Sequence, residues 1–158
     1  MKNFWRRLWT LALAVCAAWA AHTAAAQTPI AIGNTQALAF GKFAAGGGGT
    51  VTVGPSGARS AGGGVVLVSS GTGAAAQFSV SGDANGTYAI SLPADGTVSL
   101  ASGANSMAVN TFTSSPSPTG TLGAGGTQTL LVGATLTVGG NQPVGSYSGA
   151  FDVTVNYN

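Results

Sequence analysis

The chain has 158 residues, of which 26 are glycine, and only 5% are charged. Three of its five basic residues, Lys2, Arg6 and Arg7, lie at the N-terminus. The rest of the chain therefore contains two basic residues, Lys42 and Arg59, and three aspartates. A nucleic-acid-binding surface needs a cluster of phosphate-neutralising side chains, which two separated cations do not provide, and we therefore exclude nucleic acid as a partner. This length fits a single domain with one core.

The first 26 residues have the pattern of a secretory signal peptide. Basic residues precede an apolar run from Leu8 to about Ala21, and small residues end the segment at Ala24 to Ala26. This order is typical of an A-x-A cleavage site at Ala24 and Ala26, so we expect the mature domain to span Gln27 to the end. The run is short for a bilayer span and no second one follows, so we expect no membrane span in the mature chain. An uncleaved N-terminal anchor is the alternative.

From residue 27 onward, short segments of alternating apolar residues are separated by turns, and no segment carries apolar residues at helical spacing. Because successive side chains of a strand point to opposite faces, each segment has one core face. The pattern predicts an all-β sandwich or barrel. The expected strands contain Val51 and Val53; Val65 to Val68; Phe78 and Val80; Tyr88, Ile90 and Leu92; Val98 and Leu100; Met107, Val109 and Phe112; Leu130 to Val138; and Tyr147 to Tyr157.

Glycine, proline, asparagine and aspartate are concentrated between these segments, as expected for turns. Glycine and serine are abundant and charge is low, so we expect any disorder to be confined to the region from Gly46 to Gly64 and to the first few residues of the mature chain. The expected turns are Gly46 to Gly49, Gly54 to Gly57, Gly62 to Gly64, Asp83 to Gly86, Pro93 to Gly96, Ser114 to Gly120, and Gly139 to Pro143.

The residues expected in the mature chain lack the groups that most enzymes use. The only histidine, His22, and the only cysteine, Cys16, fall within the signal segment, so a serine nucleophile would have no imidazole base. Asp83 and Asp95 lie in turn sequences, and Asp152 has the opposite parity to its apolar neighbours and should face solvent. A pair of catalytic carboxylates is therefore not expected. We predict that the protein is not an enzyme.

Two glycine-containing motifs resemble ligand loops but are incomplete. Asp83-Ala84-Asn85-Gly86 is similar to the start of a calcium loop, which also needs a terminal glutamate, and the chain has no glutamate. The run Gly46 to Gly49 lacks the Lys-Ser/Thr pair of a phosphate loop and leads into a strand. We therefore interpret both as turns and predict no metal and no cofactor.

The C-terminal segment carries the most specific pattern. Gly145 is the fourteenth residue counted back from Asn158, and the apolar residues after it alternate up to a penultimate aromatic residue. This pattern resembles the C-terminal signature of chaperone-usher pilus subunits. The resemblance implies an assembly-facing and chaperone-facing strand, although a final core strand of any sandwich is the alternative. The residues that carry it are Gly145, Tyr147, Phe151, Val153, Val155 and Tyr157.

A second resemblance covers most of the mature chain. The segments Leu38-Ala39-Phe40-Gly41, Gly49-Thr50-Val51-Thr52-Val53, Val132-Gly133-Ala134-Thr135-Leu136 and Gly145-Ser146-Tyr147-Ser148-Gly149 are similar to the domain of unknown function 4402 family, secreted bacterial proteins associated with fimbrial subunits. The resemblance implies an immunoglobulin-like β-sandwich that lacks its last strand, which the N-terminal extension of the next subunit supplies.

The implied partners are like subunits, a periplasmic chaperone and an outer-membrane usher, with export through the periplasm to the cell surface. The chain departs from the better-known pilins in having no cysteine pair, and its candidate donor segment, Gln27 to Gln36, offers only Ile30 and Ile32 as same-face anchors. A self-contained, secreted β-sandwich that binds a ligand such as carbohydrate, or serves in a matrix, is the alternative function.

Overall fold

The computed structural model describes residues 26–158, and every regular element among them is a β-strand. The all-β prediction is therefore confirmed. Ala24 and the rest of the predicted signal segment lie outside the described residues, except for Ala26, which is exposed. The strands are β1 (Ala31–Gln36), β2 (Phe43–Ala44), β3 (Gly49–Val53), β4 (Arg59–Gly63), β5 (Val66–Leu67), β6 (Ala76–Ser81), β7 (Thr87–Ser91), β8 (Val98–Ser102), β9 (Asn105–Ser115), β10 (Thr119–Thr121), β11 (Thr127–Val138) and β12 (Thr154–Tyr157).

The larger sheet is organised around β11. The first half of β11 pairs with β6 and its second half pairs with β3, while its other edge pairs with β9. β1 extends the sheet beyond β6, β4 extends it beyond β3, and β8 extends it beyond β9. A three-stranded sheet in the order β10-β7-β12 packs against it, and β2 and β5 form a short ribbon. All pairings are antiparallel.

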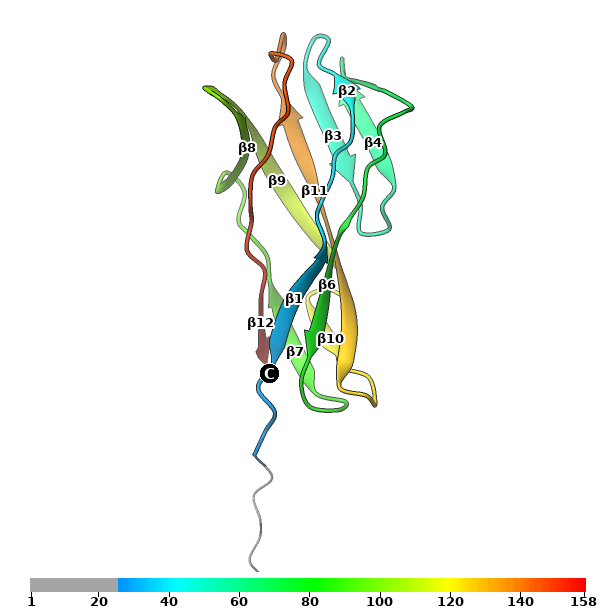
Figure 1. Cartoon of the computed structure of the whole chain (residues 1–158), viewed down its shortest axis with the longest axis vertical. Coiled ribbons are helices and arrows are strands. Elements are labelled where there is room, and N and C mark those ends of the chain that lie inside the picture. The colour runs from blue at the N-terminus through cyan, green and yellow to red at the C-terminus, as the bar shows by residue number, and fades with distance from the viewer. Residues whose placement is uncertain (1–25) are drawn as a thin grey trace, which may run out of the picture.

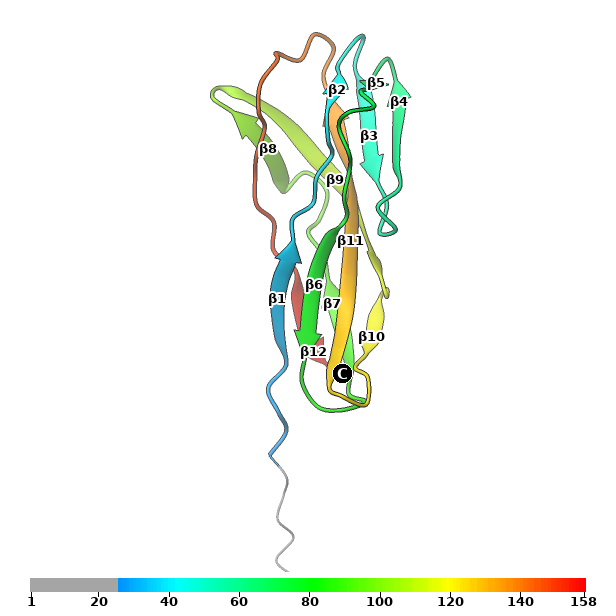
Figure 2. The ribbon, with the colours of Figure 1, turned by 45° about the vertical axis from the view of Figure 1, so that its right-hand side comes forward.

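The molecule is elongated, and its strands divide into two halves (Figures 1 and 2). The strands β1, β6, β7, β10 and β12 lie in the half that carries the N-terminal segment. The strands β2 to β5 and β8 lie in the other half, and β9 and β11 run through both. The strand order matches that of an immunoglobulin sandwich, in which one sheet has the order A-B-E-D and the facing sheet contains C and F. Here the first sheet has the order β1-β6-β11-β9, and the facing sheet contains β7 and β12.

Each half has its own apolar core. In the lower half, which carries the N-terminal segment, the inward-facing residues of the two sheets meet. In the upper half the larger sheet is covered instead by residues 38–45, residues 65–67 and Tyr147. The upper core contains Phe40, Val51, Val53, Val65, Met107, Val109, Ala134, Leu136 and Val138. The lower core contains Ala76, Phe78, Val80, Tyr88, Leu122, Leu130, Val132 and Val155. Leu38 and Phe112 pack against both cores. These two residues join the halves at the waist of the sandwich.

The structure differs from the sequence-based expectations in three segments. The glycine-rich region 46–64 forms the hairpin of β3 and β4, closed by a hydrogen bond of 2.8 Å from Gly57 N–H to the Gly54 carbonyl. The apolar run 65–68 contains only the two-residue strand β5, which pairs with the equally short β2, and Val66 in it is 63% exposed. The last strand, expected over 147–157, begins only at Thr154.

Candidate binding groove

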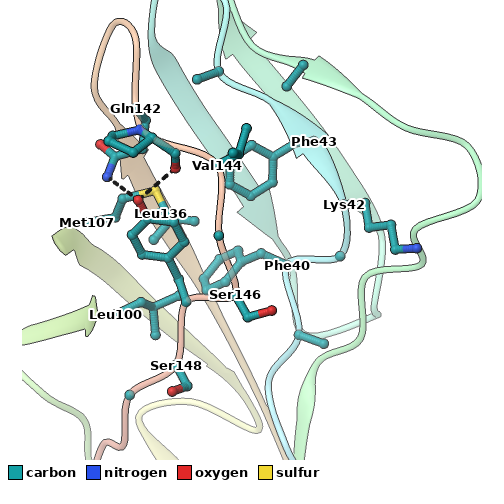
Figure 3. A pocket seen from close by; sticks show the side chains of 18 of the residues that line it. Phe40, Lys42, Phe43, Leu100, Met107, Leu136, Gln142, Val144, Ser146 and Ser148 are labelled. Carbon is teal, nitrogen blue, oxygen red and sulfur yellow. Dashed lines mark hydrogen bonds between the residues drawn. The ribbon is translucent and has the colours of Figure 1, made fainter. Parts of the chain in front are cut away.

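An apolar groove of about 1060 Å³ opens in the upper half, between two extended segments (Figure 3). One rim is residues 37–46, which lead from β1 through β2, and the other is residues 141–149, which lead toward β12. Leu100, Met107 and Leu136 form the floor together with the Phe40 ring, so the groove lies directly over the upper core. We call this feature the groove, and its two sides the N-rim (37–46) and the C-rim (141–149).

The N-rim is paired along one edge only. Ala39 exchanges two backbone hydrogen bonds with Ala74, at 2.9 and 2.8 Å, and β2 pairs with β5. The Arg59 guanidinium donates to the carbonyls of Phe40 and Lys42, at 3.0 and 3.2 Å. None of these partners lines the groove.

Gly41 changes the direction of the N-rim. It has a φ of +70°, and a side chain there would collide with Arg59 and with the carbonyl of Thr72. Leu38 and Phe40 face the core before this glycine and Phe43 faces it afterwards, although an unbroken alternation would point Lys42 inward. The Lys42 side chain instead points away from the groove (Figure 3). The charged end of Lys42 therefore stays out of the groove, and the floor between the two rims is apolar.

The C-rim is paired even more sparsely. Ser148 exchanges backbone hydrogen bonds with Ala101 of β8, at 3.1 and 2.8 Å, and regular pairing with β7 begins only at Thr154. Gly149 permits this approach, because a side chain there would overlap the Ser99 carbonyl. Among the described residues, the two rims share one backbone hydrogen bond, 3.4 Å from Asn141 N–H to the Gly46 carbonyl at the end of the groove.

The expected C-terminal site residues follow the predicted alternation, but only some of them line the groove. The Tyr147 ring lies over the upper core, and its hydroxyl donates to the Pro143 carbonyl at 2.8 Å. Gly145 is exposed on the C-rim. Phe151 lies at the waist, with its ring centroid 5.1 Å from that of Phe112 and 6.2 Å from that of Phe78.

The remaining C-terminal residues, Val153, Val155 and Tyr157, pack in the lower core. Asp152 is exposed on the opposite face, as its parity predicts. The sequence pattern therefore predicts one continuous inward face. In the structure, Tyr147 at one end of this face lies in the groove, and Val155 and Tyr157 at the other end lie in the lower core.

The candidate donor segment lies in the lower half. Ile30 and Ile32 are half-buried against the lower core, and β1 pairs with β6 of its own domain. The register shifts between Asn34 and Gln36, and the pairing ends at Gln36, just before the N-rim. In the single chain, β1 is therefore an edge strand of its own sandwich.

A second, smaller cavity of about 130 Å³ continues the groove toward the waist. It shares Ala37, Leu38, Phe40, Leu100 and Gly149 with the groove and ends against Phe151. The two cavities together follow the space between the rims toward β1 and β12. Sequence reasoning did not single out Leu38 and Phe40 as lining residues, although their alternation before Gly41 was a signal for an inward face.

The described residues offer few groups for chemistry near the groove. Among residues 26–158, no three His, Cys, Asp or Glu side chains gather closely enough to hold a metal ion. Asp83 lies in the β6–β7 turn, where Gly86 N–H donates to its carbonyl at 3.0 Å, as the turn interpretation predicts. No helix in this part of the chain is long and apolar enough to cross a membrane.

The fold is an all-β sandwich with an elongated apolar groove between two half-paired rims. Residues 30–157 match a family model described as domain of unknown function (DUF4402), so the chain belongs to this family, as the sequence resemblance predicted. No curated protein and no solved structure gave a match.

Proposed function

We propose that the protein is a secreted structural subunit of a bacterial surface fimbria or pilus, with a role in adhesion. In this proposal the groove accepts an extended strand from a like subunit. The observation that carries the proposal is the combination of an apolar floor with two backbone rims that each have a free edge. An added strand would satisfy backbone donors and acceptors on the rims and would cover the apolar floor at the same time.

The position of the groove supports a linear polymer. The N-terminal segment leaves the molecule at the lower end, whereas the groove opens in the upper half (Figure 1). A contact between the lower end of one copy and the upper half of the next is heterologous, and such contacts produce open filaments when the rotation does not close. The strand of the second copy that fits this arrangement is its N-terminal segment, residues 27–36.

Export requirements complete the proposal. An apolar groove with free backbone edges is a hazard for aggregation until it is filled. We therefore expect two partners during export. A periplasmic chaperone would cover the groove, and an outer-membrane usher would direct the exchange of the chaperone for the next subunit. The sparse charge of the chain is compatible with close association of copies, because few like charges oppose it.

The proposal is tested by blocking the groove. Ser146 lies exposed on the C-rim, so Ser146→Trp places an indole in the groove without replacing a core residue. We expect this variant to unfold at the same temperature as the wild type and to lose the detergent-resistant ladder on unheated gels and the filaments in electron micrographs. Ser60→Trp, on the exposed face of β4 and outside the groove, is the matched control and should assemble normally.

A self-contained ligand-binding sandwich is the second candidate, and the pairing of β1 with its own β6 favours it. In that case the wild-type protein would stay monomeric and melt cooperatively, and no ladder would form in any variant. The groove would then take a small apolar or aromatic ligand between Phe40 and Tyr147, since its volume is comparable with that of known ligand sites. Filaments from the wild type that persist in Ser146→Trp would refute the groove as the assembly site.

A further inference from the structure

The segment just before β1 is fastened to β12, the last strand, by a ring of three hydrogen bonds. The Tyr157 hydroxyl donates to the Thr28 carbonyl at 2.9 Å and accepts from Asp83 N–H at 2.6 Å. The Thr28 N–H in turn donates to Asp83 Oδ1 at 2.8 Å. The ring thereby joins the residues before β1, the β6–β7 turn and β12.

The turn is shaped to receive the Tyr157 ring. A side chain at Gly82 would overlap the Tyr157 hydroxyl, and a Cβ at Gly86 would lie 3.0 Å from Tyr157 Cε1. Both glycines flank Asp83, so the backbone can bring the Asp83 N–H and carboxylate to the same point. The Tyr157 hydroxyl therefore contacts the β6–β7 turn and the segment before β1 at the same time.

The ring lies where it can control β1. Apart from the ring, β1 is held by its ladder with β6 and by the two half-buried side chains Ile30 and Ile32. At its far end the side chains of Asn34, Thr35 and Gln36 donate to carbonyls on the β6 side, so the ring is the side-chain fastening at the first residues of the segment. Five of the six residues of β1 are exposed, and β1 is an edge strand. An edge strand with so little buried surface has a low free energy of local opening. Hydrogen bonds at its first residues therefore contribute a large part of that free energy.

We propose that Tyr157, Asp83 and Thr28 form a latch that keeps β1 in its own domain, and that opening the latch frees β1 for a second copy. The second half of this inference rests on the proposed function. The latch holds the free subunit in a closed resting state. Strand exchange between copies then begins with the loss of these three hydrogen bonds.

Hydrogen exchange of the full chain, in its monomeric state after export, tests the latch without requiring a polymer. Tyr157→Phe removes the hydroxyl alone, and Asp83→Ala removes the carboxylate. Each variant should speed exchange of the amides in residues 28–36 by about 3- to 10-fold or more, since 3- to 10-fold corresponds to the net contribution of one hydrogen bond. Exchange in β9 and β11 should be unchanged.

Two further variants separate a latch from general loosening. Asp95→Ala is the matched control, because Asp95 Oδ1 also accepts a backbone N–H, that of Thr111 at 2.6 Å, and Asp95 is outside the ring. It should leave residues 28–36 unchanged. Asp83→Asn keeps an oxygen at the Oδ1 position and should restore the wild-type exchange rate.

The latch is refuted if residues 28–36 exchange at the wild-type rate in both Tyr157→Phe and Asp83→Ala, or if Asp95→Ala speeds them equally. Assembly kinetics decide the second half separately. Latch variants with an intact groove should polymerise about 3- to 10-fold faster than the wild type. Faster exchange without faster assembly, in a protein whose wild type does form filaments, would contradict the release of β1 and leave the groove proposal standing.

Discussion

Tyr88 is a fully buried side chain whose hydroxyl donates to Gln128 Oε1 at 2.7 Å in the lower core. Burial raises the pKa of Tyr88 above its ordinary value of 10.0, because the charged phenolate is poorly solvated there. The folded state therefore keeps this proton at pH values where the unfolded chain loses it. The stabilisation is complete below pH 10 and declines as the pH rises from about 10 toward the pKa of the folded state.

We expect Tyr88→Phe to lower the free energy of unfolding by about 1 to 2 kcal/mol at pH 8, because Gln128 loses its partner. We also expect its unfolding free energy to decline less steeply above pH 10 than that of the wild type. Denaturant unfolding followed by circular dichroism from pH 8 to about pH 11 measures both effects. Equal alkaline slopes in the two proteins would contradict the role of this hydroxyl.

Single residues near the C-terminus show what the sequence can and cannot predict. The alternation from Tyr147 to Tyr157 predicts the inward face, and the exposure of Asp152 agrees with it. The pattern emphasised Gly145, yet the glycine that a close backbone contact requires is Gly149. That requirement comes from β8, which is distant in sequence, so no local pattern could reveal it.

The N-rim is held by backbone pairing and by the side chain of Arg59. Arg59, at the start of β4, donates to the carbonyls of Phe40 and Lys42 and, at 3.0 Å, to that of Val68. We expect Arg59→Met to lower the free energy of unfolding by about 2 kcal/mol, since charge-assisted hydrogen bonds to three carbonyls are lost. Hydrogen exchange should increase in residues 39–44 and 66–74 and remain unchanged in β12.

Lys42→Met is the control for this prediction. Lys42 is exposed, and its side chain points away from the groove (Figure 3). Its loss removes one positive charge without removing a hydrogen bond of the N-rim. A similar loss of stability in both variants would show that charge, and not the bonds of Arg59 to the rim, stabilises this element.

Strands with regular alternation were predictable, and strands formed by non-local pairing were not. Val51 and Val53 predict β3, and the run from Leu130 to Val138 predicts most of β11. β4 has the sequence Arg-Ser-Ala-Gly-Gly, which carries no alternation, and it forms because β3 offers an edge across a tight turn. A sandwich that lacks its last strand, as the family resemblance implies, is expected to expose an apolar groove. The residues that line the groove were not predictable, because its two rims come from segments about 100 residues apart in the sequence.

The whole molecule has an apolar groove and very few charges, which determines how its proposed assembly should respond to salt. Screening weakens contacts between exposed charges, but it has little effect on apolar burial. We expect the rate and yield of polymer to change less than about twofold between 50 and 500 mM NaCl, measured by light scattering. A decrease of tenfold or more would indicate an interface built on ion pairs and would contradict assembly through the groove.

The hydrogen bond between Tyr157 and Thr28 also means that the two ends of the described chain meet at one point. A circular permutant can therefore join them with a short linker and open new termini in the exposed turn between β3 and β4, with every strand pairing retained. In that permutant β1 would follow β12 directly and would be tethered at both ends. Such a chain should remain a monomer, since β1 would be an internal segment and could no longer reach a second copy as a free N-terminal strand.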